Sequence, residues 1–267
     1  MIFFDGRFHT NILDEQIKDS ILKKKPSKKL AIIMIGNNQS SDKYVSIKEK
    51  LCLKFGIPVL IERIDERLSN DVIEEKVKRV CLSQNVGGVI IQLPLPRKSL
   101  NSILSLIPEE KDIDLISPNA LEKYYSGDFS KLSPVVRSFK YFINNTGIKL
   151  ENTDTTIIGM GLLVGEPLGY FLLQQEAKVQ FILDYKPETS LNCQLLILSA
   201  GYPALVKGER IPEGCNVVDF GSSVVDGKTI GDLDLKSEID HLGAVSPSPG
   251  GMGPLVTRYL IMNYLGI

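Results

Sequence analysis

Residues 156–167 read TIIGMGLLVGEP, and they indicate a strand that turns sharply into a helix. β-Branched residues run into Gly159 and Gly161, and an apolar segment follows Gly165. Glycines at such a turn let the backbone approach a ligand, and the N–H groups that begin a helix stabilise the charge of a pyrophosphate. The spacing is GxGxxxG rather than GxGxxG, so a dinucleotide-binding loop and a tight turn without a ligand both stay open.

An acidic residue favours the first of these interpretations. The next β-rich run, KVQFILD at 178–184, ends on Asp184. A carboxylate at the end of that strand is placed to accept hydrogen bonds from the hydroxyls of an adenine-linked ribose. The glycine turn and Asp184 together therefore predict a dinucleotide site.

Short apolar runs alternate with longer amphipathic segments on both sides of the turn. Before it, the pattern predicts strands at 30–36, 57–64 and 87–93 and helices at 41–56 and 70–83, the second capped by Ser69 or Asn70. A polar junction at 144–153 precedes strands at 155–159, 178–184, 193–199 and 215–221 and a helix at about 164–176. This alternation predicts an α/β fold of two parallel-sheet domains with a ligand cleft between them.

Composition excludes several classes of function. The 267 residues carry a net charge of −1, so nothing global attracts nucleic acid or an anionic membrane, and the basic run at 23–29 is interpreted as a solvated loop. No apolar run approaches the ~20 residues of a membrane span, and the N-terminus lacks a signal-peptide pattern. The four cysteines lack metal-ligand spacing, so we expect reduced core thiols, a cytoplasmic location and no metal. With two histidines in the chain, proton chemistry falls to Lys, Tyr, Asp or Glu.

The segment KYVSIK places Tyr44 and Lys48 four residues apart, on one face of a predicted helix. A lysine beside a phenol in a partly closed cleft has a less stable charge, which suits proton transfer near neutral pH. Such a spacing is also common by chance on exposed helices, so it carries weight only together with other residues.

Two further segments place polar residues at predicted strand or loop ends. In IIQLPLP at 90–96 a strand ends at Gln92, and a carboxyl strand end faces the ligand side of a parallel sheet. In EKDIDLISPNA at 110–120, Asp112 and Asp114 flank one apolar residue. One aspartate is expected to face a ligand while the other caps or turns the chain.

The loop PSPGGMGP at 247–254 carries Gly250, Gly251 and Gly253 just before a last apolar helix. Its backbone amides are suited to contact a ligand, and a helix-initiating loop without a ligand is the alternative.

Taken in order, these segments resemble the bifunctional methylenetetrahydrofolate dehydrogenase/cyclohydrolase family. The resemblance rests on YVxxK, QLPLP, KDID, the glycine turn, VVDFGSSVVDGKTIGDLD at 217–234 and PGGxGP, and it spans about residues 40–260. Short-chain dehydrogenases also use YxxxK, but their glycine motif precedes that tetrad, whereas here it follows by more than a hundred residues.

The resemblance implies a folate-binding catalytic α/β domain at 1–133 and a Rossmann-like dinucleotide-binding domain at 134–251, with the C-terminal helix at 252–267 returning to the first. It implies oxidation of 5,10-methylenetetrahydrofolate with NAD or NADP, hydrolysis of the product to 10-formyltetrahydrofolate, and a homodimer. The implied catalytic residues are Lys48, Tyr44, Gln92 and Asp114. The folate would also contact Leu93, Pro94, Pro249, Gly250, Gly251, Gly253 and Pro254, and the nucleotide would contact Gly159, Met160, Gly161, Asp184 and Ser222.

Three departures from the family pattern stand out. Leu115 replaces the glycine after Asp114, Met160 replaces an arginine in the glycine turn, and LSPVVRS at 132–138 replaces a Pro-Cys-Thr-Pro segment. Met160 and Asp184 together favour NAD over NADP. A dehydrogenase of the shikimate or amino-acid type, and a folate- or nucleotide-binding protein that has lost catalysis, are the alternatives.

Overall fold

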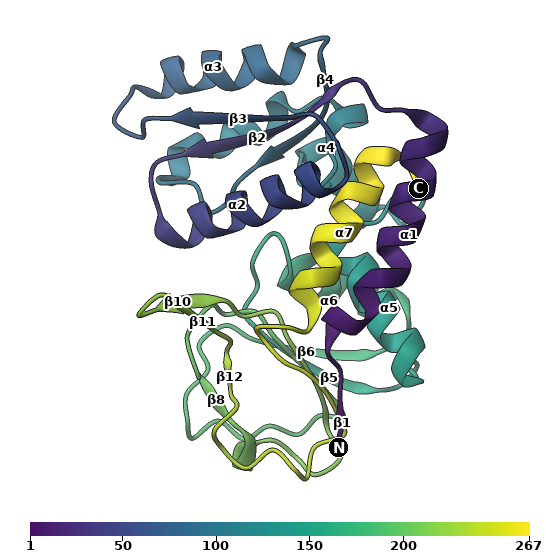
Figure 1. The fold of residues 1–267 in the computed structure, drawn as a ribbon. Coiled ribbons are helices and arrows are strands. Elements are labelled where there is room, and N and C mark those ends of the chain that lie inside the picture. The colour runs from purple at the N-terminus through teal and green to yellow at the C-terminus, as the bar shows by residue number, and fades with distance from the viewer. The chain divides into compact units, whose positions relative to one another are not determined.

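The computed structural model describes residues 1–267 and divides into two compact units (Figure 1). The three-stranded unit comprises Asp14–Ser133 and Leu260–Ile267, and the six-stranded unit comprises Met1–Leu13 and Pro134–Tyr259. The helices α1 (Gly6–Lys24) and α7 (Met252–Leu265) therefore contribute residues to both units.

The three-stranded unit is built on a parallel sheet in the order β3-β2-β4. The central strand is a continuous apolar run in which residues 30–34 are at most 1% exposed, as expected of a parallel strand covered on both faces. All three predicted strands are confirmed with slightly shifted ends: β2 is Lys29–Ile35, β3 is Val59–Ile64 and β4 is Val86–Ile91.

The predicted helices of this unit are also confirmed. The Asn38 side chain caps α2 by accepting the Ser41 N–H at 3.0 Å. Ser69 is the N-cap of α3 but makes no side-chain cap bond, and the Asn70 amide instead donates to the Ser99 carbonyl at 3.2 Å. The helical elements are α2 (Gln39–Lys54), α3 (Asn70–Leu82), η1 (Lys98–Leu106), η2 (Glu109–Lys111) and α4 (Pro118–Tyr125).

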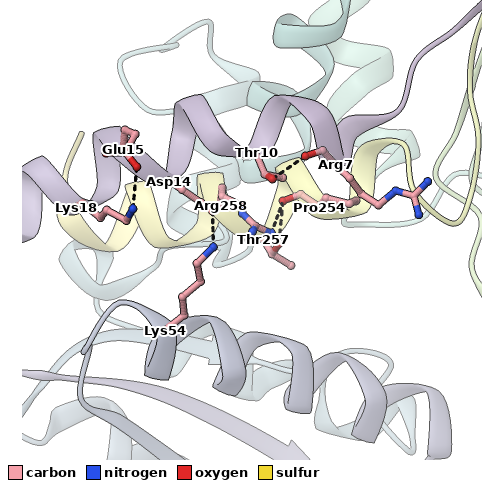
Figure 2. A network of polar contacts seen from close by, with 9 residues as sticks. All are labelled: Arg7, Thr10, Asp14, Glu15, Lys18, Lys54, Pro254, Thr257 and Arg258. Carbon is pink, nitrogen blue, oxygen red and sulfur yellow. Dashed lines mark hydrogen bonds and ion pairs between the residues drawn. The ribbon is translucent and has the colours of Figure 1, made fainter.

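The end of the C-terminal helix belongs to this same unit, as predicted. The Asn263 amide donates to the carbonyls of Ile113 at 2.9 Å and Leu132 at 3.1 Å. The buried Asp14 carboxylate, on α1, forms an ion pair with the Lys54 ammonium, on α2, at an N···O distance of 2.6 Å (Figure 2). These bonds attach the last residues of α7 and the second half of α1 to the sheet-bearing segment.

The six-stranded unit contains a parallel sheet in the order β1-β13-β9-β7-β5-β6. The chain runs from β5 to β6 on one side and then returns to β7 on the other side of β5. The strand order therefore reverses between β5 and β7, where open α/β sheets bind ligands at the carboxyl ends. The strands are β1 (Ile2–Phe3), β5 (Asp154–Ile158), β6 (Lys178–Ile182), β7 (Leu195–Leu198), β9 (Asn216–Asp219) and β13 (Ala244–Ser246).

This unit confirms the predicted second sheet and the helix after the glycine turn. The sequence pattern did not predict two small pairings in this unit. Residues 223–230 form a hairpin between β9 and β13, and residues 206–207, which precede β9, pair in parallel with residues 233–234. None of the helices of the chain combines the length and apolar character needed to cross a membrane. The remaining elements are α5 (Pro134–Thr146), α6 (Gly165–Gln174), β8 (Val206–Lys207), η3 (Gly208–Arg210), β10 (Ser223–Val225), β11 (Lys228–Ile230) and β12 (Leu233–Asp234).

Candidate functional site

Lys48 and Gln92 meet in the three-stranded unit. The Gln92 N–H continues the pairing of β4 with β2 by donating to the Ile33 carbonyl at 2.9 Å, which carries Gln92 past the carboxyl end of its strand. The Lys48 ammonium, on α2, donates to Gln92 Oε1 at 2.9 Å. Because Gln92 Nε2 donates to the Leu93 carbonyl at 2.7 Å, the amide oxygen is the end that faces the lysine.

The two aspartates of the KDID segment have different surroundings. Asp112 forms an isolated parallel bridge with Val89, so this segment runs beside β4. The buried Asp112 carboxylate accepts the N–H groups of Ile116 at 3.2 Å and Ser117 at 2.8 Å. Asp112 is therefore the residue that turns the chain.

The charges of Lys48 and Asp114 influence one another. Desolvation lowers the pKa of the Lys48 ammonium, and the Asp114 carboxylate opposes that shift. Desolvation raises the pKa of Asp114, and Lys48 opposes that shift in turn. Desolvation thus disfavours both charges, and each charge partly offsets the cost of burying the other, as is common for ionisable groups at functional sites. Tyr44 lies one helical turn before Lys48 on α2 and is partly buried.

Leu115 adopts a left-handed backbone conformation with φ +56°. This conformation favours glycine, the residue that the family pattern has at this position. The turn after Asp114 therefore keeps the backbone of a glycine although it carries a leucine. Next to Gln92, Leu93 is partly exposed and Pro94 is exposed after a cis peptide bond.

The glycine turn of the six-stranded unit is built by two close approaches. Gly159 has φ +96°, and a Cβ on it would lie 2.6 Å from the backbone of Ser199 and Ala200. A Cβ on Gly165 would lie 2.0 Å from the Gly159 carbonyl oxygen. A Cβ on Gly161 would have no neighbour within 4 Å, so the fold itself does not require a glycine there.

The turn fits a dinucleotide. It lies at the carboxyl end of β5, where the strand order reverses, and it leads into the N-terminus of α6, where a pyrophosphate is stabilised. Asp184 is exposed just beyond β6, the strand next to β5, and its carboxylate lies 3.7 Å from the Lys186 ammonium. Met160, in the turn, and Ser222, between β9 and β10, are partly buried.

The loop at 247–254 has a closely packed backbone. Gly250 has φ +107°, and a Cβ on Gly251 would lie 2.2 Å from Ser246 Oγ. The Gly251 N–H donates to the Pro247 carbonyl at 2.8 Å. Gly253 and Pro254 belong to the first turn of α7, and a Cβ on Gly253 would meet nothing within 4 Å. The bond Ser248–Pro249 is cis.

The predicted residues divide between the two units, and Lys48 and Gln92 are in direct contact. The three-stranded unit holds Tyr44, Lys48, Gln92, Leu93, Pro94 and Asp114, and the six-stranded unit holds Gly159, Met160, Gly161, Asp184, Ser222, Pro249, Gly250, Gly251, Gly253 and Pro254.

Sequence reasoning missed the segment at 199–202, which packs directly on Gly159. Ser199 donates its hydroxyl to the Gly159 carbonyl at 2.9 Å. The position of this segment could have indicated its role, because SAGYP directly follows an apolar strand, as the glycine turn does. The segment itself carries no recognisable motif.

Two family models match nearly the whole chain. The catalytic-domain model of tetrahydrofolate dehydrogenase/cyclohydrolase matches residues 4–114, and its NAD(P)-binding-domain model matches residues 135–267.

Individual relatives agree with these matches. The Bifunctional protein FolD of Hydrogenobaculum sp. (strain Y04AAS1) is 30% identical over 275 residues, which cover 99% of this chain and 98% of the relative. The Bifunctional protein FolD of Aquifex aeolicus (strain VF5) is 31% identical over 279 residues, which cover 99% and 94% of the two chains. The crystal structure of the bifunctional enzyme FolD, a methylenetetrahydrofolate dehydrogenase/cyclohydrolase from Campylobacter jejuni, has a TM-score of 0.88 at 28% identity, covering 100% of this chain and 98% of that chain. The chain therefore belongs to the tetrahydrofolate dehydrogenase/cyclohydrolase family.

Proposed function

We propose that this protein oxidises 5,10-methylenetetrahydrofolate with a nicotinamide dinucleotide and hydrolyses the resulting 5,10-methenyltetrahydrofolate to 10-formyltetrahydrofolate. Membership of the family supports both reactions. The observation that carries the proposal is the hydrogen bond from Lys48 to Gln92, in a site where Lys48 and Asp114 offset each other's desolvation.

In the hydrolysis, water adds to the methenyl carbon, the ring opens and one proton is released. The lowered pKa of Lys48 makes the free amine more accessible near neutral pH, and an amine can accept a proton from the attacking water. Gln92 would hold the lysine in place through its amide oxygen, while its Nε2 group donates to the Leu93 carbonyl. The Gln92 amide would thereby lie beside the reacting centre. Tyr44, Leu93 and Pro94 would line the pterin, and Asp114 would accept its N–H groups.

In the oxidation, the bound dinucleotide supplies the hydride acceptor. The neighbouring folate nitrogen donates its lone pair as the hydride leaves, so no strong base is needed and the chain's residues chiefly orient the reactants. Gly159, Met160 and Gly161 would hold the pyrophosphate, while Asp184 and Ser222 would bind the ribose side. The loop from Pro249 to Pro254, with Gly250, Gly251 and Gly253, would complete the folate wall.

The proposal also covers the domain boundaries, the cellular location, the oligomeric state and the cofactor preference. The folate domain is assigned to residues 1–133 and 252–267, and the nucleotide domain to 134–251. The protein is expected to be a cytoplasmic homodimer and to prefer NAD, because Met160 and Asp184 replace residues suited to a 2′-phosphate.

Absorbance assays test the function. The purified protein should convert 5,10-methylenetetrahydrofolate to the methenyl form in the presence of NAD or NADP and should consume methenyltetrahydrofolate without either. Hydrolysis without oxidation would identify a protein that has lost the dehydrogenase step, which the changed residues Met160 and 132–138 would explain. Absence of both reactions, with oxidation of a hydroxy acid such as shikimate, would support the other dehydrogenase class.

A further inference from the structure

Two buried carboxylates in the six-stranded unit lie outside the residues assigned so far. Asp219 ends β9, and Asp232 lies between β11 and β12. They are 1% and 0% exposed, respectively. A buried carboxylate is costly unless N–H groups are directed at it, so the partners of both show what each one holds in place.

Asp232 holds the segment that follows β7. Its Oδ2 accepts the N–H of Ala200 at 2.6 Å and that of Gly201 at 3.1 Å, and the Tyr202 N–H also interacts with this carboxylate. The same segment packs on the glycine turn, because a Cβ on Gly159 would lie 2.6 Å from the Ala200 nitrogen. One carboxylate therefore fixes the backbone against which the turn at Gly159 is seated.

The second oxygen of Asp232 lies against the segment that follows β9. Asp232 Oδ1 is buried and has no hydrogen-bond partner. A Cβ on Gly221 would lie 2.0 Å from this oxygen, so only a glycine permits the approach. The fold thus retains a desolvated, half-satisfied carboxylate, an arrangement that stability alone does not favour.

Asp219 completes the connection from the other side. Its carboxylate accepts the N–H groups of Gly221 at 2.7 Å, Asp232 at 3.2 Å and Leu233 at 3.0 Å. Ser223, one residue after the predicted nucleotide contact Ser222, donates to the Gly201 carbonyl at 2.8 Å. The segments after β7 and β9 and the segment before β12 are therefore held together by these two carboxylates and one hydroxyl.

We propose that Asp232 is a positioning residue of the dinucleotide site, whose carboxylate holds residues 200–202 in the conformation that seats the glycine turn. The inference rests on the proposed function, because it assumes that the turn binds a nicotinamide dinucleotide. Its role is exerted through the backbone of Ala200 and Gly201, since both of those N–H groups point at the carboxylate. Loss of the carboxylate should therefore weaken nucleotide binding and spare the folate reaction that needs no nucleotide.

The test uses the full-length protein with three substitutions. Asp232→Ala removes both acceptors, Asp232→Asn keeps one acceptor of similar shape, and Asp234→Asn is the matched control. Asp234 lies two residues further along, and its side chain accepts the Lys236 N–H at 3.0 Å through Oδ1. Titration calorimetry with NAD and NADP gives the dissociation constants, and the decay of methenyltetrahydrofolate without nucleotide gives the hydrolysis rate.

For Asp232→Ala we expect the dissociation constant of the preferred nucleotide to rise about 10- to 100-fold, the effect of losing two hydrogen bonds to a charged acceptor. Asp232→Asn should recover part of that loss, and Asp234→Asn should bind as the wild type does. Hydrolysis per folded molecule should stay within about twofold of wild type, because the bonds lost do not involve the three-stranded unit. An unchanged dissociation constant, or parallel losses of binding and hydrolysis, would overturn the inference.

A second variant and a wild-type control separate the positioning role of Asp232 from the proposed function. If Asp232→Ala does not fold, Ser223→Ala removes a single bond to Gly201 at an exposed site and should raise the dissociation constant about two- to fivefold. Unchanged binding in both Ser223→Ala and Asp232→Asn would contradict the inference. Wild-type protein that binds neither nucleotide would contradict the proposed function itself, whereas equal binding by wild type and Asp232→Ala contradicts the positioning role alone.

Discussion

The Lys48 ammonium donates to Gln92 Oε1 at 2.9 Å although the two residues are 44 positions apart in the chain. One residue comes from the middle of α2 and the other from the end of β4. Gln92 Nε2 is engaged by the Leu93 carbonyl, which leaves the amide oxygen for Lys48. The lysine is therefore held at its tip by a neutral acceptor while desolvation lowers its pKa, a combination suited to proton transfer rather than to a stabilising ion pair.

Lys48→Met should abolish hydrolysis of methenyltetrahydrofolate, with a rate loss of at least about 100-fold, because the proposed proton acceptor is gone. The melting temperature should change little, since methionine keeps the aliphatic part of the side chain. Lys50→Met is the matched control, because Lys50 is exposed on the same helix. Near-normal hydrolysis by Lys48→Met would remove Lys48 from the mechanism.

Asp114→Ala should weaken folate binding by roughly 10- to 150-fold, the effect of losing the proposed charge-assisted hydrogen bond to the pterin. Nucleotide binding should change little, and separate titrations with folate and nucleotide measure both. Asp112→Asn should behave differently and lower the thermal stability, because Asp112 accepts the N–H groups of Ile116 and Ser117. Equal weakening of both ligands by Asp114→Ala would show that Asp114 is structural as well.

Leu115 offers a test of backbone strain, because its φ is +56°. Leu115→Gly and Leu115→Ala both remove the side chain, but only glycine relieves the left-handed conformation, so the glycine variant should be the more stable by about 1 kcal/mol. At Leu53, exposed within α2, the same pair should show the opposite order, with alanine more stable by about 1 kcal/mol. Urea unfolding of the four variants measures both orders, and alanine exceeding glycine at both positions would refute the strain.

Asp219 predicts a pH dependence of stability. Desolvation raises the pKa of this carboxyl group from 3.8 to about 7. Between these values the folded state holds a proton that the unfolded chain has released, so the free energy of unfolding falls as pH rises. This contribution is fully present below the unfolded pKa and is lost as pH rises through the folded pKa.

Substitution separates that contribution from other titrations. Asp219→Asn should lower the stability overall, since Asp219 accepts three backbone N–H groups, but it should flatten the decline between about pH 5 and about pH 7.5. Asp226→Asn, an exposed aspartate in the turn of the β10–β11 hairpin, is the control for the change of charge. Thermal melts over this pH range give the slopes, and equal slopes for wild type and Asp219→Asn would contradict the assignment.

The parts of the fold that were predicted from the sequence depend on local patterns. Buried parallel strands such as β2 and β7 are short continuous apolar runs. The ends of two other strands, β4 and β5, place Gln92 and Gly159 at the carboxyl edges of the sheets. The sequence predicted that one of Asp112 and Asp114 caps or turns the chain while the other faces a ligand. Only the structure shows that Asp112 is the one that turns the chain.

The parts that were not predicted depend on contacts between distant segments. Asp232 reaches Ala200 across 32 positions, and no spacing in GDLD distinguishes that carboxylate from an ordinary cap. The left-handed conformation of Leu115 was equally hidden, because a leucine gives no signal of a positive φ. Such features are set by the close approach of whole loops, which the sequence pattern of one loop does not contain.

The glycine turn at 156–167 carries the prediction of cofactor preference, which concerns the 2′ position of the adenine ribose. Met160 stands where the family pattern has an arginine, so the cationic partner of a 2′-phosphate is gone. Asp184 is exposed beyond β6, and a carboxylate there accepts hydrogen bonds from ribose hydroxyls but repels a phosphate. Lys186 lies 3.7 Å from the Asp184 carboxylate, and the Arg137 guanidinium lies 4.6 Å from the centre of the Tyr259 ring, so both of these cations already have a partner.

Steady-state kinetics with both cofactors should therefore give a higher kcat/KM for NAD. Losing one charge-assisted partner and gaining a repulsive carboxylate corresponds to about 2–4 kcal/mol, or roughly 30- to 1000-fold in preference. Asp184→Ser should narrow the gap by removing the repulsion, and Met160→Arg in the same background should narrow it further by restoring a cation. Lys186→Ala tests the competing route: if Lys186 turned to a 2′-phosphate, its loss would weaken NADP far more than NAD. A higher kcat/KM for NADP in the wild-type protein would overturn the prediction, because neither Met160 nor Asp184 provides a partner for that phosphate.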